Sequence, residues 1–221
     1  MMVKVIFIGG TGTDIGKTYV TCLLLRQLLD KGYKVRAIKP VISGFDEMAI
    51  DQSDSGLLLR EMGLEPNLHN AVKISPWRFK QPLPPHLVAN NMALPIDIEE
   101  VARFCQRQAE DDLDFLLIEG VGGIMTPLDY ETTTLDLMVR LNCTCLLVTG
   151  SYLGTLSHTL TALTCLKQSG VAVSGVIISE SERNYINFDE IIPDFTKIIP
   201  KYSIKKIGRN SRTVDIFSLI I

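Results

Sequence analysis

The sequence lacks both an excess of positive charge and a long hydrophobic run. Its 221 residues include 22 Lys and Arg against 25 Asp and Glu, a formal net charge of −3, so no broad basic surface is expected to neutralise a phosphodiester backbone. The apolar run at residues 3–8 is too short for a signal-peptide core or a membrane span. We therefore expect a cytoplasmic protein that binds neither nucleic acid nor a membrane.

Cysteine and histidine are few and scattered. The five cysteines are odd in number, include no C-x-x-C pair and lie mostly in apolar stretches, so we expect buried, reduced thiols. The three histidines have no acidic or thiol neighbours at ligand spacing, so no transition-metal site is predicted. Internal repeats and low-complexity tracts are absent. The length and a hydrophobic fraction of 46% favour one globular domain over residues 1–221.

Short β-branched runs alternate with longer amphipathic segments along the chain. The short runs predict strands at residues 3–8, 35–39, 115–119, 146–150 and 173–179. The longer segments predict helices over about residues 17–31, 53–62, 97–110 and 155–168. The segment 63–95 is rich in proline and asparagine and is predicted to form irregular excursions from the sheet.

Three of the predicted strands are apolar on consecutive residues rather than on alternate ones. This pattern is typical of strands that helices cover on both faces of a parallel sheet. The predicted fold is therefore an α/β, doubly wound, mostly parallel sheet flanked by helices. Ligands of such folds bind outside the carboxyl ends of the strands, so the residues that follow each apolar run are candidate site residues.

A glycine-rich loop, residues 10–18, follows the first predicted strand and ends in Gly-Lys-Thr at the start of a helix. The backbone N–H groups of such a loop surround phosphate oxygens, the lysine reaches the β- and γ-phosphates, and the hydroxyl ligates magnesium. Lys17 and Thr18 occupy the last two positions. Counted from Gly10, the loop is one residue longer than the standard G-x-x-x-x-G-K-[ST] motif. The sequence therefore predicts a fold of the P-loop NTPase type.

Two acids are candidate magnesium ligands besides Thr18. Glu119 ends a buried strand and precedes a run of glycines, so its carboxylate is expected at the same sheet edge as the phosphate loop. Asp54 lies at a predicted helix start, where the alternative is an N-terminal capping or dipole role. The sequence leaves that choice open.

Lys39 directly follows the second predicted strand, where it could hold an anionic substrate or stabilise a phosphoryl group in transfer. The alternative is an ordinary surface lysine. The segment 153–158 opens a helix after another strand and is a weaker candidate anion site. These residues indicate a magnesium-dependent nucleotide triphosphatase or phosphotransferase of the P-loop class, and they do not identify its substrate.

The motifs taken together resemble the dethiobiotin synthetase family, in order along nearly the whole chain. The matching segments are GTGTDIGKT at 10–18, GYKVRAIKPVISG at 32–44, QSD at 52–54, PH at 85–86, IEGVGG at 118–123, MTPL at 125–128 and LGTLSH at 153–158. The longer phosphate loop is itself a feature of that family. Several motifs in one order are far more specific than the loop alone.

The resemblance implies closure of a cyclic urea from 7,8-diaminopelargonate, carbon dioxide and ATP, with Mg²⁺, to give dethiobiotin, ADP and phosphate through a phosphorylated carbamate. It implies that the nucleotide contacts Thr13, Asp14, Ile15, Gly16, Lys17, Thr18, Asp54, Glu119 and Ser179, with Thr18, Asp54 and Glu119 as the metal ligands. It assigns the diamine and its carbamate to Lys39, Ser43 and Gly122. Lys17, Lys39 and Glu119 are the implied catalytic residues.

The resemblance also implies a homodimer with shared sites. The substrate's carboxylate tail would bind a helix start of the partner subunit, which corresponds to Leu153, Gly154, Thr155, Leu156 and Ser157. The chain departs from the family pattern at Gly12, Asp14, Tyr152, Ser157 and Ser179. Ser179 replaces the asparagine expected to recognise the base, so the preferred base is left open.

Three alternatives compete with this interpretation. A positioning or partitioning ATPase of the deviant P-loop kind carries a lysine five residues before the loop's invariant lysine, where this chain has Gly12. A ligase resembling cobyrinate diamide synthases carries a glutaminase domain, for which this chain is too short. A non-catalytic nucleotide-binding module would bind nucleotide without turning it over in the presence of the diamine.

Overall fold

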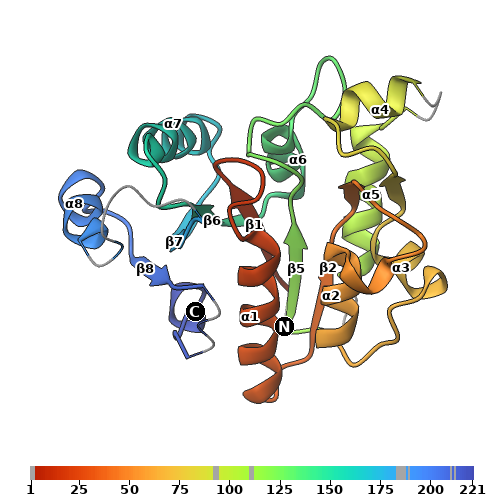
Figure 1. The fold of residues 1–221 in the computed structure, drawn as a ribbon, viewed down its shortest axis with the longest axis horizontal. Coiled ribbons are helices and arrows are strands. Elements are labelled where there is room, and N and C mark those ends of the chain that lie inside the picture. The colour runs from red at the N-terminus through yellow and green to blue at the C-terminus, as the bar shows by residue number, and fades with distance from the viewer. Residues whose placement is uncertain are drawn as a thin grey trace.

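The structure is a computed structural model, and it describes residues 3–91, 95–109, 112–182, 188, 190–209, 211 and 213–221. Its main sheet has six strands in the order β2-β5-β1-β6-β7-β8. Every neighbouring pair in this sheet is parallel. The strands are β1 (Lys4–Gly10), β2 (Val35–Ile38), β5 (Phe115–Glu119), β6 (Thr144–Thr149), β7 (Val173–Ser179) and β8 (Ile204–Ile207). The predicted α/β fold with a parallel sheet is confirmed (Figure 1).

The predicted helices are present, with ends shifted by at most a few residues. They are α1 (Lys17–Asp30), α2 (Asp54–Glu61), α5 (Ile98–Gln108) and α7 (Thr155–Gln168), joined by α6 (Thr134–Leu141) and α8 (Ile191–Ile198), which were not predicted. Helix α1 lies beside β5 in Figure 1 and packs on α2, whereas α5 packs on α6. The helices therefore flank the sheet.

The segment 63–95 is more regular than predicted. It contains α3 (Leu68–Ile74), β4 (Trp77–Phe79) and α4 (Pro85–Asn91). Strand β4 pairs in parallel with β3 (Val41–Ser43) to form a separate two-stranded sheet. The prediction of irregular structure was wrong here because these elements are very short and depend on pairing with a distant part of the chain. Their effect is to bring residues 82–86 to the same cavity as the loop that follows β1.

The core consists of the apolar strands and the inner faces of the helices. Ile6, Ile8, Leu117 and Ile118 at the centre of the sheet have no exposed surface. The cysteines are free, and Cys105, Cys143 and Cys145 are buried, whereas Cys22 and Cys165 are partly exposed. In the described part of the chain, no helix has both the length and the apolar character needed to cross a membrane.

The C-terminal segment is hydrogen-bonded to α1 through Gln27. The Gln27 side chain donates to the carbonyl oxygen of Val214 at 2.7 Å, and its own oxygen accepts from the backbone N–H groups of Ile216 and Phe217 at 3.0 Å. The 3₁₀ helix Phe217–Leu219 (η2) completes this contact. The end of the chain therefore supports the helix that the phosphate loop begins.

Candidate functional site

Parallel pairing brings the phosphate loop between two neighbouring strand ends. In the register of β1 with its neighbours, Ile8 lies opposite Glu119 of β5 and Gly10 lies opposite Val148 of β6. The loop itself turns through left-handed conformations at Asp14, with φ 56°, and at Gly16, with φ 90°. The carboxyl ends of β5 and β6 thus flank the loop, as expected for a ligand site in this fold.

Gly16 is required by its surroundings as well as by its backbone angles. A Cβ atom at this position would lie 2.5 Å from the Ser179 hydroxyl oxygen, closer than side-chain atoms can approach. Glycine also adopts a positive φ without the steric cost that other residues pay. The end of β7 therefore packs directly on the phosphate loop at the first turn of α1.

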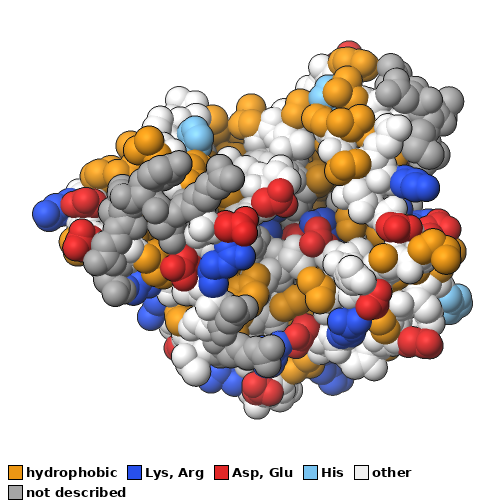
Figure 2. Space-filling model, viewed as in Figure 1, with side chains coloured by type: hydrophobic (Ala, Val, Ile, Leu, Met, Phe, Trp, Pro, Cys, Tyr) orange, Lys and Arg blue, Asp and Glu red, His pale blue; other side chains and the backbone are white. Residues whose placement is uncertain are grey.

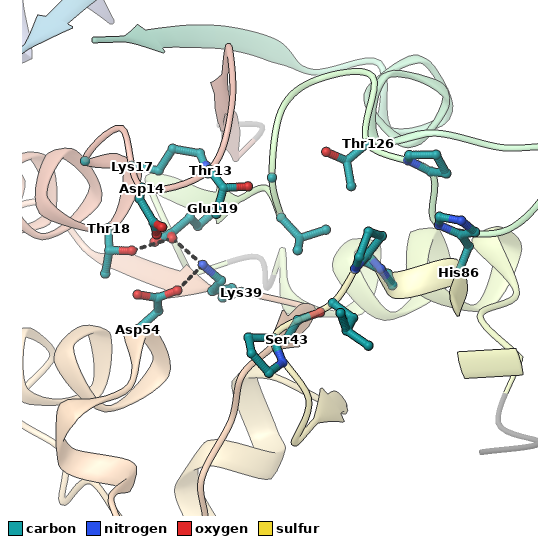
Figure 3. A pocket seen from close by; sticks show the side chains of 18 residues that line it. Thr13, Asp14, Lys17, Thr18, Lys39, Ser43, Asp54, His86, Glu119 and Thr126 are labelled. Atoms are coloured by element: carbon teal, nitrogen blue, oxygen red, sulfur yellow. Dashed lines mark hydrogen bonds and ion pairs between the residues drawn. The ribbon is translucent and has the colours of Figure 1, made fainter. Parts of the chain in front are cut away.

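A cavity of about 720 Å³ opens in front of this loop. Figure 2 shows a hollow on this face of the molecule, with basic and acidic side chains inside it, while the other basic side chains on the face are scattered. Figure 3 shows the lining side chains from close by. The cavity is lined by Thr13, Asp14, Gly16, Lys17, Thr18, Lys39, Ser43, Asp54, Pro82, Leu83, Pro84, Pro85, His86, Glu119, Val121, Gly122, Thr126 and Pro127.

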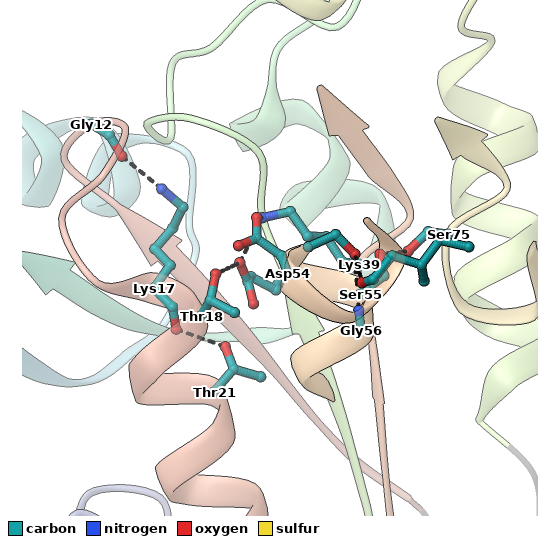
Figure 4. A network of polar contacts seen from close by, with 12 residues as sticks. Gly12, Lys17, Thr18, Thr21, Lys39, Asp54, Ser55, Gly56 and Ser75 are labelled. Atoms are coloured by element: carbon teal, nitrogen blue, oxygen red, sulfur yellow. Dashed lines mark hydrogen bonds and ion pairs between the residues drawn. The ribbon is translucent and has the colours of Figure 1, made fainter. Parts of the chain in front are cut away.

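A network of charged side chains occupies the phosphate-loop end of the cavity (Figures 3 and 4). The Lys39 ammonium donates to Glu119 Oε1 at 2.6 Å and also forms an ion pair with Asp54. The Thr18 hydroxyl donates to the same Glu119 oxygen at 2.7 Å. Lys39 and Glu119 are buried, so the interpretation of Lys39 as an ordinary surface lysine is wrong.

The charges of this network shift one another's pKa values. Burial alone would lower the pKa of Lys39, but the negative charges of Glu119 and Asp54 outweigh burial and raise it above its usual value. Burial would raise the pKa of Asp54, but the Lys39 charge and hydrogen bond hold it below its usual value. Burial, and then repulsion from Lys39, lower the pKa of Lys17 to about 8. Lys17 therefore has the least compensated charge of the three groups.

The structure gives the capping position of α2 to Ser53 and not to Asp54. Ser53 is the N-cap of α2, and its side-chain oxygen accepts from the Gly56 backbone N–H at 3.1 Å. Asp54 is the first residue of the helix, and its carboxylate faces Lys39 instead of capping the backbone. Its acidic group also lies favourably at the positive end of the helix dipole. Asp54 is therefore available to a ligand in the cavity.

The oxygen atoms at this end of the cavity fit a magnesium ion. Glu119 Oε2 is buried and has no hydrogen-bond partner in the described part of the chain, although buried carboxylate oxygens normally have one. Thr18 and Asp54 add a hydroxyl and a second carboxylate, and Mg²⁺ takes few protein oxygens together with phosphate oxygens and water. Among the described residues, no group of three or more His, Cys, Asp or Glu side chains could hold a metal ion by itself. A magnesium ion here would therefore depend on nucleotide phosphates.

The structure brings together most of the residues predicted for the site. Those that line the cavity are Thr13, Asp14, Gly16, Lys17, Thr18, Lys39, Ser43, Asp54, Glu119 and Gly122. Ile15 belongs to the loop, but its side chain is buried against Gly10 and it lies outside the cavity lining. Ser179 contacts the loop at Gly16 and lies outside the cavity lining.

The predicted segment 153–157 also lies outside this cavity lining. It begins α7, whose N-cap Gly154 has φ 97° and makes no side-chain cap hydrogen bond. Leu153 is 74% exposed, so the start of the helix is open to the outside of the molecule. This placement would let the segment reach another subunit, but it gives no contact with the cavity of its own chain.

Sequence reasoning missed the end of the cavity that is remote from the phosphate loop. The proline-rich segment 82–86 and the segment 126–127 line this end, and His86 is its titratable side chain. Both segments contain motifs of the family resemblance, PH and MTPL, so a signal was present. The motifs were not assigned to the site because PH falls in the segment predicted to be irregular and the two motifs are about 40 residues apart.

Comparison with known proteins finds relatives that carry one and the same name. A family model described as an AAA domain matches residues 4–210. The ATP-dependent dethiobiotin synthetase BioD of Caulobacter vibrioides is 44% identical over 179 residues, which cover 80% of this chain and 80% of that protein. The protein of the same name from Francisella tularensis subsp. holarctica is 31% identical over 216 residues, which cover 98% of this chain and 97% of that protein.

Solved structures share the fold at lower sequence identity. The cell division ATPase MinD of Pyrococcus furiosus has a TM-score of 0.58 and 21% identity, covering 95% of this chain and 84% of its own. A chain of the MinC:MinD cell division protein complex of Aquifex aeolicus has a TM-score of 0.57 and 16% identity, covering 98% of this chain and 86% of that one. These similarities support the P-loop fold and do not distinguish between functions.

Proposed function

We infer the function from the family, because this chain belongs to the ATP-dependent dethiobiotin synthetases. We propose that it is an ATP-dependent ligase of biotin biosynthesis. Its reaction joins 7,8-diaminopelargonate and carbon dioxide into the cyclic urea of dethiobiotin and converts ATP to ADP and phosphate. One observation supports this function most directly: a single cavity connects a phosphate-binding loop to an end with apolar walls and few polar groups.

The site residues form two groups, one that would hold ATP with Mg²⁺ and one that would hold the diamine with its carbamate. Lys17 and the backbone of residues 13–16 would hold the triphosphate of ATP. Thr18, Asp54 and Glu119 would hold Mg²⁺, which when bound supplies positive charge to the phosphate oxygens. Lys39, Ser43 and Gly122 would hold the diamine and its carbamate, since all three line the cavity beside the phosphate loop.

The reaction requires positioning rather than a protein nucleophile. An uncharged amine attacks carbon dioxide and loses a proton to give a carbamate, and a carbamate oxygen then takes the γ-phosphoryl group with release of ADP. The second amine attacks the carbamate carbon, the carbon–oxygen bond to phosphate breaks, and phosphate leaves while the amine loses a proton. Lys17 and Lys39 carry the charges that stabilise the transferring group.

The active form would be a homodimer. At the start of α7, Leu153, Gly154 and Ser157 are exposed and the helix has no side-chain cap, so the N–H groups of Leu156 and Ser157 would bind a carboxylate of substrate in the partner subunit. We further propose a cytoplasmic location, where ATP and biosynthetic intermediates are available.

Incubation with 7,8-diaminopelargonate, bicarbonate, Mg²⁺ and ATP tests the function, with dethiobiotin detected by mass. We expect dethiobiotin and phosphate to form in equal amounts. Glu119→Gln should lower the rate by roughly two to three decades, because one oriented electrostatic contact is lost. Glu61→Gln is the matched control, because Glu61 pairs with Arg26 outside the cavity and should leave the rate unchanged. Nucleotide hydrolysis without dethiobiotin would favour a switch ATPase instead.

A further inference from the structure

Three buried polar atoms in the cavity have no hydrogen-bond partner among the residues that the structure describes. They are Glu119 Oε2, Ser43 Oγ and His86 Nδ1. Buried polar atoms in folded proteins are nearly always paired, so unpaired ones grouped in a cavity mark positions where a ligand completes the hydrogen bonds. The roles proposed above account for Glu119 and Ser43. They leave His86 without a function.

His86 lies at the end of the cavity opposite the phosphate loop. Figure 3 shows its ring beside α4, with Ser43 between it and the charged network and with Thr126 nearby. The walls around this end are apolar and consist of Pro82, Leu83, Pro84, Pro85, Val121 and Pro127. The cavity thus has a charged end, an apolar middle and a polar group at the far end.

Packing holds the His86 ring in place. The ring meets that of Tyr130 edge to face, with centroids 5.6 Å apart and an angle of 76° between the planes. Val88 and Ala89, which follow it in α4, are buried in the core and anchor the helix. A fixed ring with an unpaired buried nitrogen is suited to orienting a ligand.

The charge distribution identifies which part of a ligand would reach this end. The other charged side chains that line the cavity are Asp14, Lys17, Lys39, Asp54 and Glu119, all at the phosphate-loop end. In the proposed reaction both amines of the diamine must lie beside the γ-phosphate, at that same end. The aliphatic chain would then follow the apolar walls, and the carboxylate remains for the far end.

We propose that His86 binds the carboxylate of the diamine substrate, with Nδ1–H as the hydrogen-bond donor. This inference rests on the proposed function. A neutral imidazole with its proton on Nδ1 is a sufficient donor, since one ring nitrogen of histidine always carries a proton. A carboxylate has two oxygens with several acceptor positions, so His86 and the helix start of a partner subunit can each bond to the same group.

The test compares two substrates that differ only in the carboxylate. Kinetics are measured with 7,8-diaminopelargonate and with 2,3-diaminooctane, in which hydrogen replaces the carboxyl group. In His86→Phe we expect KM for diaminopelargonate to rise roughly tenfold or more, because a hydrogen bond to a charged group is lost. KM for 2,3-diaminooctane and for ATP should not change.

Two further variants separate binding from structure. His86→Asn keeps a donor near the position of Nδ1 and should recover part of the affinity for diaminopelargonate. Ser43→Ala should raise KM for both diamines, because Ser43 lies closer to the amines. An equal loss with both diamines in His86→Phe, or no loss with either, would overturn the proposal. If the unmodified protein makes no dethiobiotin, the proposed function fails, and this inference fails with it.

Discussion

The two buried lysines of the cavity have different partners. Lys39 donates to two carboxylates, whereas Lys17 donates to the backbone carbonyl oxygen of Gly12 at 2.7 Å. A neutral oxygen compensates a buried positive charge less well than an ion pair does. The folded protein without nucleotide therefore carries an unfavourable charge on Lys17, which the phosphates of ATP would neutralise.

This difference predicts a stabilising substitution. The folded pKa of Lys17 is about 8 and its ordinary value is 10.5, so the unfolded chain holds this proton more tightly. The Lys17 contribution to stability is therefore complete above pH 10.5 and is lost as the pH falls through about 8. At pH 7, Lys17→Met should be more stable than the unmodified protein, by on the order of 2 kcal/mol.

Urea unfolding without nucleotide at pH 7 and pH 10 tests this expectation. The advantage of Lys17→Met should shrink at the higher pH, because the lysine is then mostly neutral in the folded protein. Lys201→Met is a control for the loss of an exposed positive charge. An advantage of the same size at both pH values would attribute the gain to apolar packing rather than to charge.

The elements of the fold differ in how far their own residues predict them. The strand FLLIE was predicted with its observed bounds, because a consecutive apolar run is a strong local signal. Strand β8 was missed because its IKKI sequence has lysines at its centre, and β3 and β4 have only three residues each. Short strands of this kind form because distant partners approach them, which local sequence does not encode.

The same distinction applies to the site. The phosphate loop and Glu119 were predicted, because a glycine-rich turn and an acid at a strand end are local patterns. The availability of Asp54 could not be predicted, since it depends on Ser53 taking the capping position. His86 was missed because its place depends on where the segment 82–86 meets residues from the β5–α6 connection.

The contact between β7 and the phosphate loop bears on which nucleotide base the protein prefers. Ser179 ends β7 and packs on Gly16, while the neighbouring Glu180 carboxylate accepts from the backbone N–H of Arg209 at 2.8 Å. A serine hydroxyl lacks the paired donor and acceptor of an asparagine amide, so it cannot match the edge of one particular base. We expect weak discrimination among nucleoside triphosphates.

Values of kcat/KM with ATP, GTP and CTP test this expectation. In the unmodified protein, GTP or CTP should support dethiobiotin formation within about tenfold of ATP, since one hydrogen bond contributes about 1 kcal/mol. Ser179→Asn should raise the preference for ATP. A strong ATP preference in the unmodified protein would contradict this and would move base recognition to other residues.

At the scale of the whole molecule, the start of α7, residues 153–157, lies outside the lining of the cavity. If each site takes residues from both subunits, two inactive variants with substitutions in different parts of the site can complement each other in a mixed dimer. Lys17→Ala removes the phosphate contact, and Ser157→Glu places a negative charge at the helix start, where it should repel the substrate carboxylate. Each variant alone should be nearly inactive.

Mixing subunits of the two variants in equal amounts should restore activity. Half of the dimers would be mixed, and each mixed dimer would have one site with neither substitution, so roughly a quarter of the normal activity should return. Analytical ultracentrifugation should show dimers throughout. No recovery after confirmed exchange of subunits would mean that each site is built from one chain.

The ion pairs of Lys39 have a consequence for how this sequence can change over evolutionary time. A substitution that removes Lys39 leaves the buried carboxylate of Glu119 without its ion-pair partner, and breaking a buried pair in this way typically costs about 3 to 5 kcal/mol. That is a large part of the stability of an ordinary domain. Selection for folding alone would therefore retain the lysine, even in a descendant that no longer needed it for a reaction.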